Sequence, residues 1–252
     1  MLAQDKIVLV TGAGSGIGRS SSLLFAAEGA AHVIVADRDP IGASKTVKLI
    51  TESGGGATAV EIDVCDESDV STMVDEIVAD HGRIDIAFNN AGISDTMREF
   101  HKLDISLWNH MIAVNLTSVF MCMKHELRHM SAAGRGAIVN TSSGAGVVAA
   151  PGQPHYTAAK HGVVGLTKAA AQEYARQGIR ANAVLPGSTD TPMIRGFIGD
   201  NPEIEKLIAR SNIQGRLITP DEIAAAVVWL ASDSASMVNG QSLVVDGGGI
   251  VR

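Results

Sequence analysis

Short apolar runs alternate with longer amphipathic stretches along most of this chain. Seven runs of four to six mostly aliphatic residues span residues 7–10, 33–36, 58–61, 84–88, 136–141, 180–185 and 242–246. Six stretches with helical periodicity lie between them, at residues 16–29, 40–53, 67–81, 107–133, 156–177 and 220–231. Because neighbouring parallel strands need a crossover connection, which is usually a helix, this alternation predicts a parallel sheet with helices on both faces.

The expected fold is therefore an α/β, Rossmann-type, doubly wound three-layer sandwich with a seven-stranded parallel sheet. At 46% hydrophobic and 4% aromatic residues, the core should consist mainly of small aliphatic side chains. One domain is expected over residues 1–252. Residues 188–215 form the longest segment between core elements. We expect an irregular substrate lid there, since long excursions in compact domains tend to be functional.

Composition excludes several classes of partner. The formal net charge is −7, and acids and bases are intermixed, so no basic stripe is available for nucleic acid. Cys65 and Cys122 lack metal-site or redox-motif spacing, so no metal site and two reduced thiols are expected. No apolar run reaches about 18 residues and no signal-type leader opens the chain, which predicts a cytoplasmic protein without membrane contact.

A glycine-rich turn directly follows the first predicted strand. The run TGAGSGIG covers residues 11–18 and opens into a helix. Glycines permit a tight turn and close backbone approach, while free amides and the helix dipole favour a pyrophosphate. The predicted contacts are Gly12, Ser15, Gly16, Ile17 and Gly18. Alone, such a run is also compatible with an ordinary turn.

Polar groups at the ends of other strands give this turn a context. Asp37 ends the second strand about 20 residues beyond the glycines, where an acid can accept both ribose hydroxyls and repel a 2′-phosphate. Arg38 could hold that phosphate, but Ser15 adds no second positive charge, so NAD is favoured over NADP. Further contacts are expected at the same rim of the sheet, from Asp63, Val64, Asn90, Ala91 and Gly92.

Tyr156 and Lys160 are spaced i and i+4 at the start of a predicted helix. An unperturbed phenol titrates near ~10, and lowering its pKa to about 7 requires roughly 4 kcal/mol of phenolate stabilisation. We expect Lys160, with an oxidised nicotinamide, to supply it, so that Tyr156 serves as general acid and base. Ser143, which follows a strand, can orient the substrate oxygen. On spacing alone, an ordinary exposed helical pair is equally compatible.

These ordered motifs closely resemble the short-chain dehydrogenase/reductase family along almost the whole chain. The resemblance rests on residues 11–18, the Asn89-Asn-Ala-Gly92 run, Ser143, the Tyr156-x-x-x-Lys160 pair and Asp246-Gly-Gly248. It implies that Asn115 completes a catalytic tetrad by holding a water that relays protons to Lys160. It also implies a homotetramer and a nicotinamide site that includes Pro186, Gly187, Thr189 and Thr191. Lys160 is further expected to bind the nicotinamide ribose.

The predicted function is NAD-dependent interconversion of a secondary alcohol and a ketone. The resemblance favours a small sugar, a cyclic diol or another small secondary alcohol as the substrate. Pocket walls are expected from Ser94, Asp95 and residues 144–153 and 188–197, which carry no decisive charge. A 3-oxoacyl-thioester reductase that uses NADPH remains an alternative, and so does a non-catalytic dinucleotide sensor.

A second motif, His125-Glu-Leu-Arg-His129, matches the H-E-x-x-H pattern of zinc proteases. The match falls within a helix that the fold uses for packing, and no third ligand is indicated. We interpret it as a solvated helical face. His155 and His161 flank the proposed acid–base pair, and the resemblance assigns neither of them a role.

Overall fold

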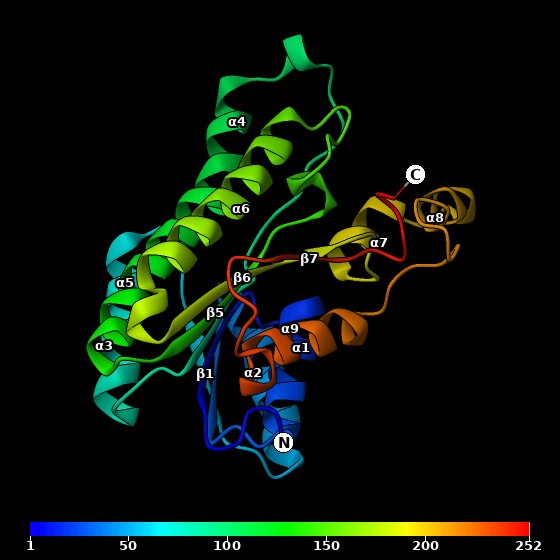
Figure 1. Cartoon of the computed structure of the whole chain (residues 1–252). Coiled ribbons are helices and arrows are strands. Elements are labelled where there is room, and N and C mark those ends of the chain that lie inside the picture. Colours follow the sequence, from blue (N-terminus) through cyan, green and yellow to red (C-terminus); the bar gives the residue numbers. More distant parts are fainter. Residues whose placement is uncertain (252) are drawn as a thin grey trace.

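The computed structural model describes residues 1–251 and contains one seven-stranded sheet (Figure 1). Its spatial order is β3-β2-β1-β4-β5-β6-β7, and all neighbouring strands are parallel. The strands are β1 (Ile7–Thr11), β2 (His32–Asp37), β3 (Ala57–Glu61), β4 (Ile86–Asn89), β5 (Gly136–Thr141), β6 (Ile179–Pro186) and β7 (Ser242–Val245). The predicted parallel Rossmann-type sheet is confirmed, with strand ends displaced by one or two residues.

Helices cover both faces of the sheet (Figure 1). On one face lie α1 (Gly16–Ala27), α2 (Pro40–Glu52) and α9 (Pro220–Ala231), and Phe25, Ile50 and Ile223 from these helices are fully buried. On the other face lie α3 (Glu67–His81), α5 (Ser118–Ala133) and α6 (Pro154–Tyr174). Every residue of β1 is buried, as expected for a strand covered on both sides.

Two helical segments differ from the sequence prediction. The long predicted helix is α4 (Ile105–Ile112), a π-helical turn (Ala113–Thr117) and α5 in continuous succession. The segment 188–215 is not irregular, because it contains α7 (Pro192–Ile198) and α8 (Pro202–Ala209). Each of these short helices begins with proline after a side-chain cap, Thr191 or Asn201. Caps of this kind give little periodic signal in a sequence.

By length and composition alone, the helix Ile105–Ala133 could cross a membrane. This differs from the expectation that no segment is apolar enough. The mean hydropathy of its most apolar 18-residue window is 1.2, and 39% of that window is buried inside the protein. Its inward face packs on the sheet and includes Met123, Leu127 and Met130. Burial against the sheet accounts for the apolar character of that face.

A buried polar network connects β4 and β5 with α5 and α6. Asn89 Nδ2 donates to Glu126 Oε2 and to Asn140 Oδ1, both at 3.0 Å, and Asn140 Nδ2 donates to Thr167 Oγ1 at 2.9 Å. Glu126 is fully buried, and its second oxygen has no hydrogen-bond partner among the described residues. Burial raises the pKa of Glu126 to about 7, against the lowering effect of the Asn89 hydrogen bond.

The expected solvated face for the His125–His129 motif is therefore wrong. Glu126 points into the core, and His125 is only 7% exposed. His125 and His129 pair separately with Glu67 and Asp75 on α3, at 3.5 and 2.7 Å. The sequence suggested a solvated face because Lys124 and Arg128 lie two residues to either side of Glu126. In the structure, the orientation of α5 directs Glu126 toward the sheet.

We expect Glu126→Gln to remove a pH-dependent cost of folding. The folded-state pKa of Glu126 lies above its unfolded value, so the wild type loses stability as pH rises from about 4.5 to about 7. At about 1.4 kcal/mol for each pKa unit, the loss is about 3 kcal/mol. Glutamine keeps the acceptor for Asn89. Urea denaturation at pH 5 and pH 8 should show the variant gaining stability relative to wild type only at the higher pH.

Glu173→Gln on the exposed side of α6 is the matched control and should behave as wild type at both pH values. A stability difference for Glu126→Gln that is the same at pH 5 and pH 8 would contradict the prediction, because Glu126 would then have the same ionisation in both states.

Candidate functional site

The carboxyl ends of β1 and β4 meet where the strand order reverses. The chain proceeds from β1 outward to β3 on one side and from β4 outward to β7 on the other, so the loops after β1 and β4 diverge. Thr11 Oγ1 holds these loops together by accepting from the Asn90 and Ala91 amides at 3.0 and 3.2 Å. Asn90 Nδ2 donates back to the Thr11 and Gly12 carbonyls, both at 3.2 Å.

A cavity of about 580 Å³ opens at this edge of the sheet. Its volume lies in the usual range for small-molecule and cofactor sites. Eighteen of the nineteen predicted site residues line it: Gly12, Ser15, Gly16, Ile17, Asp37, Asp63, Val64, Asn90, Ala91, Gly92, Asn115, Ser143, Tyr156, Lys160, Pro186, Gly187, Thr189 and Thr191. The exception is Gly18.

Gly18 does not line the cavity, because it is buried beneath the glycine turn. Its predicted contact with the cofactor stays a prediction. A methyl group at this position would lie 2.1 Å from the Gly12 carbonyl oxygen. Gly18 therefore serves the close packing of α1 against the turn.

The glycine turn presents a backbone surface to the cavity. Gly12 and Gly16 have φ angles of 63° and 51°, a region that favours glycine. A methyl group on Gly12 would lie 2.8 Å from Ala91 Cα, so no larger residue fits between the two loops. Ser15 precedes α1 without a side-chain cap, which leaves its hydroxyl and the first helical amides available to an anion.

Asp37 lies at one end of the cavity with its carboxylate fixed by backbone amides. Gly14 N donates to Asp37 Oδ2 at 2.7 Å, and Asp39 N donates to Oδ1 at 2.9 Å. Arg38 also lines this end and is exposed. The sequence singled out both residues, and their positions suit a ribose with its hydroxyl groups.

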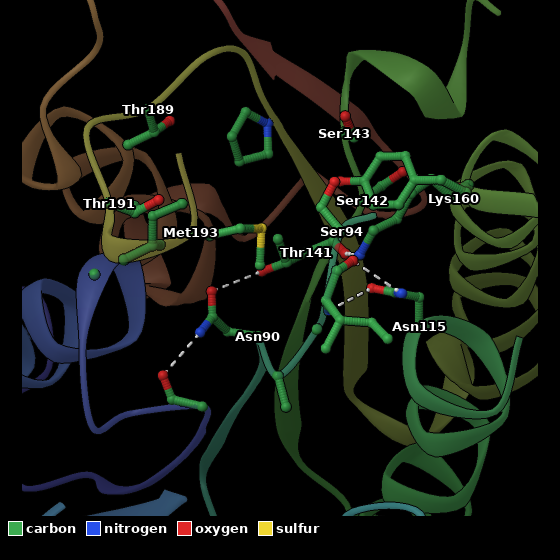
Figure 2. A pocket seen from close by; sticks show the side chains of 18 of the residues that line it. Asn90, Ser94, Asn115, Thr141, Ser142, Ser143, Lys160, Thr189, Thr191 and Met193 are labelled. Atoms are coloured by element: carbon green, nitrogen blue, oxygen red, sulfur yellow. Dashed lines mark hydrogen bonds between the residues drawn. The ribbon is translucent and has the colours of Figure 1, made fainter. Parts of the chain in front are cut away.

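Lys160, Tyr156 and Ser143 line the other end of the cavity. Figure 2 shows Lys160 and Ser143 on the same side of it. Lys160 is 3% exposed, and its ammonium donates to the Thr141 carbonyl at 2.9 Å. Its nitrogen is 5.6 Å from the centroid of the Tyr156 ring. The Ser142 hydroxyl supports the same helical turn by donating to the Lys160 carbonyl at 2.8 Å.

Burial shifts the two acid–base groups in opposite directions. It lowers the pKa of Lys160 to about 8 and raises the pKa of Tyr156, although the Ser143 side chain lowers the latter through a hydrogen bond. The expected lowering of the Tyr156 pKa involves an oxidised nicotinamide as well as Lys160, so it stays a prediction; in the chain by itself, burial raises that pKa. Loss of hydration raises the pKa of the Tyr156 phenol by more than the Ser143 hydrogen bond lowers it.

Asn115 lies in the π-helical turn between α4 and α5 and is fully buried. Its side chain donates to the Ile93 carbonyl at 3.1 Å and accepts from the Ile93 amide at 3.2 Å. A methyl group on Gly92 would lie 2.7 Å from Asn115 Oδ1 and 3.7 Å from Lys160 Nζ, so the two side chains approach the same point. Such π turns often occur at functional sites.

Other cavity residues were not predicted from the sequence. Thr141 contributes the carbonyl that binds Lys160, and Asp246 fixes the C-terminal loop by accepting from the Gly248 and Ile250 amides, both at 2.8 Å. The available signal was position at the end of a strand for Thr141 and directly after one for Asp246. The remaining additions to the predicted site, walls and lid are Ile62, Cys65, Ile93, Val114, Ser142, Gly249 and Ile250.

The expected absence of a metal site remains a prediction. Within residues 1–251, no group of three or more His, Cys, Asp or Glu side chains is placed to hold a metal ion. Both cysteines are free thiols: Cys65 is exposed at the cavity, and Cys122 is buried in the core.

Comparison with known proteins identifies the family. A family model described as enoyl-(acyl carrier protein) reductase matches residues 12–249. Cis-4-hydroxycyclohexanecarboxylate dehydrogenase of Sinomonas cyclohexanicum is 44% identical over 246 residues, which cover 97% of this chain and 96% of the relative. Cyclohexanol dehydrogenase of Acinetobacter sp. (strain SE19) is 45% identical over 243 residues, which cover 96% of this chain and 94% of the relative.

A solved structure shows the same fold over the full length. The crystal structure of carveol dehydrogenase from Mycobacterium avium in complex with NAD matches with a TM-score of 0.94 and 33% identity, covering 100% of both chains. Together with the two relatives above, this similarity extends across the glycine turn, α6 and β7. The chain belongs to the short-chain dehydrogenase/reductase family.

Proposed function

We propose that this protein is an NAD-dependent dehydrogenase that interconverts a small secondary alcohol and a ketone. The observation that carries the proposal is one cavity with Asp37 at one end and the Tyr156, Lys160 and Ser143 side chains at the other. An enzyme of this class requires both a dinucleotide site and an acid–base group in a single cavity.

The residues present fit a nicotinamide dinucleotide. The glycine turn and the uncapped start of α1 suit its pyrophosphate, and Asp37 suits the adenosine ribose. Residues Pro186 to Thr191 pass close to the turn, since a methyl group on Gly16 would lie 3.1 Å from Thr191 Cγ2. When bound in its oxidised form, the cofactor accepts hydride and adds positive charge to the cavity.

Each side chain of the catalytic end has a distinct task in this proposal. Tyr156 accepts the hydroxyl proton of the alcohol during oxidation and returns it during reduction. Ser143 orients the substrate oxygen and lowers the pKa of the phenol through its hydrogen bond. Lys160 provides a fixed positive charge next to the ring. Asn115 holds the Ile93 backbone, and a water relay through Asn115 remains part of the proposal.

The cavity lining and the names of two relatives both favour a cyclic secondary alcohol as the substrate. The cavity lining includes the apolar side chains of Ala145, Val148, Met193 and Ile250. Two relatives at 44% and 45% identity are named for cyclohexane-type alcohols. A 3-oxoacyl-thioester reductase stays the alternative; the family model is described as an enoyl-(acyl carrier protein) reductase, a name for reduction of a carbon–carbon double bond on a similar thioester carrier. Asp37 disfavours this alternative, because biosynthetic reduction commonly uses NADPH.

One assay distinguishes a non-catalytic sensor from an enzyme. Absorbance of the reduced cofactor should change during incubation with alcohols or ketones. Binding of NAD without turnover of any compound in the panel would favour the sensor. The Tyr156, Lys160 and Ser143 set supports the enzyme.

Several wider properties are also proposals. We propose that residues 188–215 act as a lid, supported by the contribution of Ser188, Met193 and Ser211 to the cavity wall. A homotetramer is supported by the half-buried outer strand β7 and by the exposed Phe120 on α5. A cytoplasmic location agrees with the two free thiols.

Tyr156→Phe should lose most turnover and keep its affinity for NAD. The variant preserves the ring but removes the hydroxyl that transfers the proton, so we expect kcat to fall by about 10²–10⁴-fold. Steady-state oxidation of cyclohexanol measures kcat, and fluorescence titration measures the Kd for NAD. Tyr174→Phe, the same change near the end of α6, should leave both unchanged. Near-normal turnover in Tyr156→Phe would remove Tyr156 from the proposed mechanism.

Asp37→Ala should weaken NAD binding and narrow discrimination against NADP. Loss of charge-assisted hydrogen bonds costs about 1.5–3 kcal/mol, which corresponds to a Kd for NAD about 10- to 100-fold higher. Titration with both cofactors gives the two Kd values. Glu61→Gln removes an equal charge on the neighbouring strand outside the cavity, and should leave the NAD Kd within about two-fold. Preference of the wild type for NADP would show that Arg38 dominates.

A further inference from the structure

The side chains of Ser94 and Gln153 meet at the catalytic end of the cavity, although they come from the separate loops that follow β4 and β5. Gln153 immediately precedes α6, and Ser94 follows β4, yet both line the cavity with Tyr156 and Ser143. Gln153 Nε2 donates to the Asp95 carbonyl at 2.5 Å and to Ser94 Oγ at 3.3 Å. In Figure 2, Ser94 lies on the same side of the cavity as Ser143 and Lys160.

These contacts determine which atoms of the pair face a ligand. A backbone carbonyl only accepts hydrogen bonds, so the nitrogen of the Gln153 amide must face Asp95. The Gln153 Oε1 acceptor then has no partner within the described part of the chain. Ser94 Oγ accepts from Gln153, and its own hydrogen is available for donation. The pair therefore offers one acceptor and one donor.

A backbone hydrogen bond joins the two loops that carry Ser94 and Gln153. The Arg98 amide donates to the Gly152 carbonyl at 2.8 Å, which joins the two loops beside the pair. His155, fully buried behind Gln153, has its Nε2 3.8 Å from Asp95 Oδ2. A fixed backbone reduces the ordering that a ligand must impose on the pair.

Other polar groups at this end already have protein partners. Ser142 donates to the Lys160 carbonyl, Ser188 shares a hydrogen bond with Ser211 at 3.1 Å, and Asn115 binds Ile93. Among residues 1–251, the cations that line the cavity are Lys160 and Arg38. Arg38 belongs to the Asp37 end, and Lys160 is bound to the Thr141 carbonyl. Arg98, which is close to the pair, does not line the cavity, and its Nε lies 3.7 Å from Asp95 Oδ2. Beside Ser94 and Gln153, a substrate carboxylate would therefore meet no cation among the described residues that both lines the cavity and is free of the Asp95 charge.

We propose that Ser94 and Gln153 form a subsite for a second, uncharged oxygen of the substrate, and most favourably for a hydroxyl group. A hydroxyl can donate to Gln153 Oε1 and accept from Ser94, so it matches both groups. This inference rests on the proposed function, because the subsite would select among ring alcohols that Tyr156 deprotonates. It assigns a diol, rather than a hydroxycarboxylate, to the same site.

The test compares cyclohexane-1,4-diol, cyclohexanol and 4-hydroxycyclohexanecarboxylate with NAD. We expect kcat/KM to be highest for the diol. In Ser94→Ala and Gln153→Met, the ratio of kcat/KM for the diol to that for cyclohexanol should fall about ten-fold, because each variant removes one hydrogen bond that cyclohexanol lacks. Ser236→Ala, an exposed serine outside the cavity, is the matched control and should leave the ratio unchanged.

Three outcomes overturn the inference. If both variants lose kcat/KM by the same factor for the diol and for cyclohexanol, the ratio is unchanged. That result would rule out the subsite but leave the proposed function intact. A wild-type preference for the hydroxycarboxylate over the diol would show that the second oxygen is charged. Absence of turnover with all three alcohols in the wild type would overturn both the subsite and the proposed function.

Discussion

The parallel sheet with its reversal of strand order between β1 and β4 determines where this protein can bind a ligand. Parallel strands place all their carboxyl ends at one edge, and loops that leave in opposite directions open a crevice there. Thr11 holds the two diverging loops at a fixed separation through the Asn90 and Ala91 amides. The glycine turn, Ser143 and the loop after β6 all reach the cavity because each follows a strand at this edge.

Within that crevice, the electrostatics of the catalytic end depend on burial. Lys160 is almost completely removed from solvent, and the Thr141 carbonyl is the partner of its ammonium. Burial lowers the pKa of Lys160 and raises that of Tyr156, so the chain alone does not prepare the phenol to lose its proton. In our proposal, the positive charge of the oxidised cofactor completes the site. Proton acceptance by Tyr156 is then linked to cofactor binding.

Much of the fold and of the site could be predicted because their signals are local. Central strands buried on both faces appear as continuous apolar runs, and residues that follow such runs are expected at one edge of the sheet. The π-helical turn around Asn115 has no such signal. Glu126 was misjudged because its neighbours on α5 are charged, and its burial depends on how the helix faces β4. The short helices α7 and α8 are too brief for a periodic pattern.

The sequence by itself determined the strand and helix order, the glycine turn and the chemical types at the strand ends, because these properties depend on neighbouring residues. Only the tertiary structure decided that Ser94 and Gln153, 59 residues apart, form one polar pair. It also decided that Glu126 is buried, and that burial raises the pKa of Tyr156 in the chain by itself. Burial and hydrogen bonding between distant segments depend on how the helices pack on the sheet, which no local pattern contains.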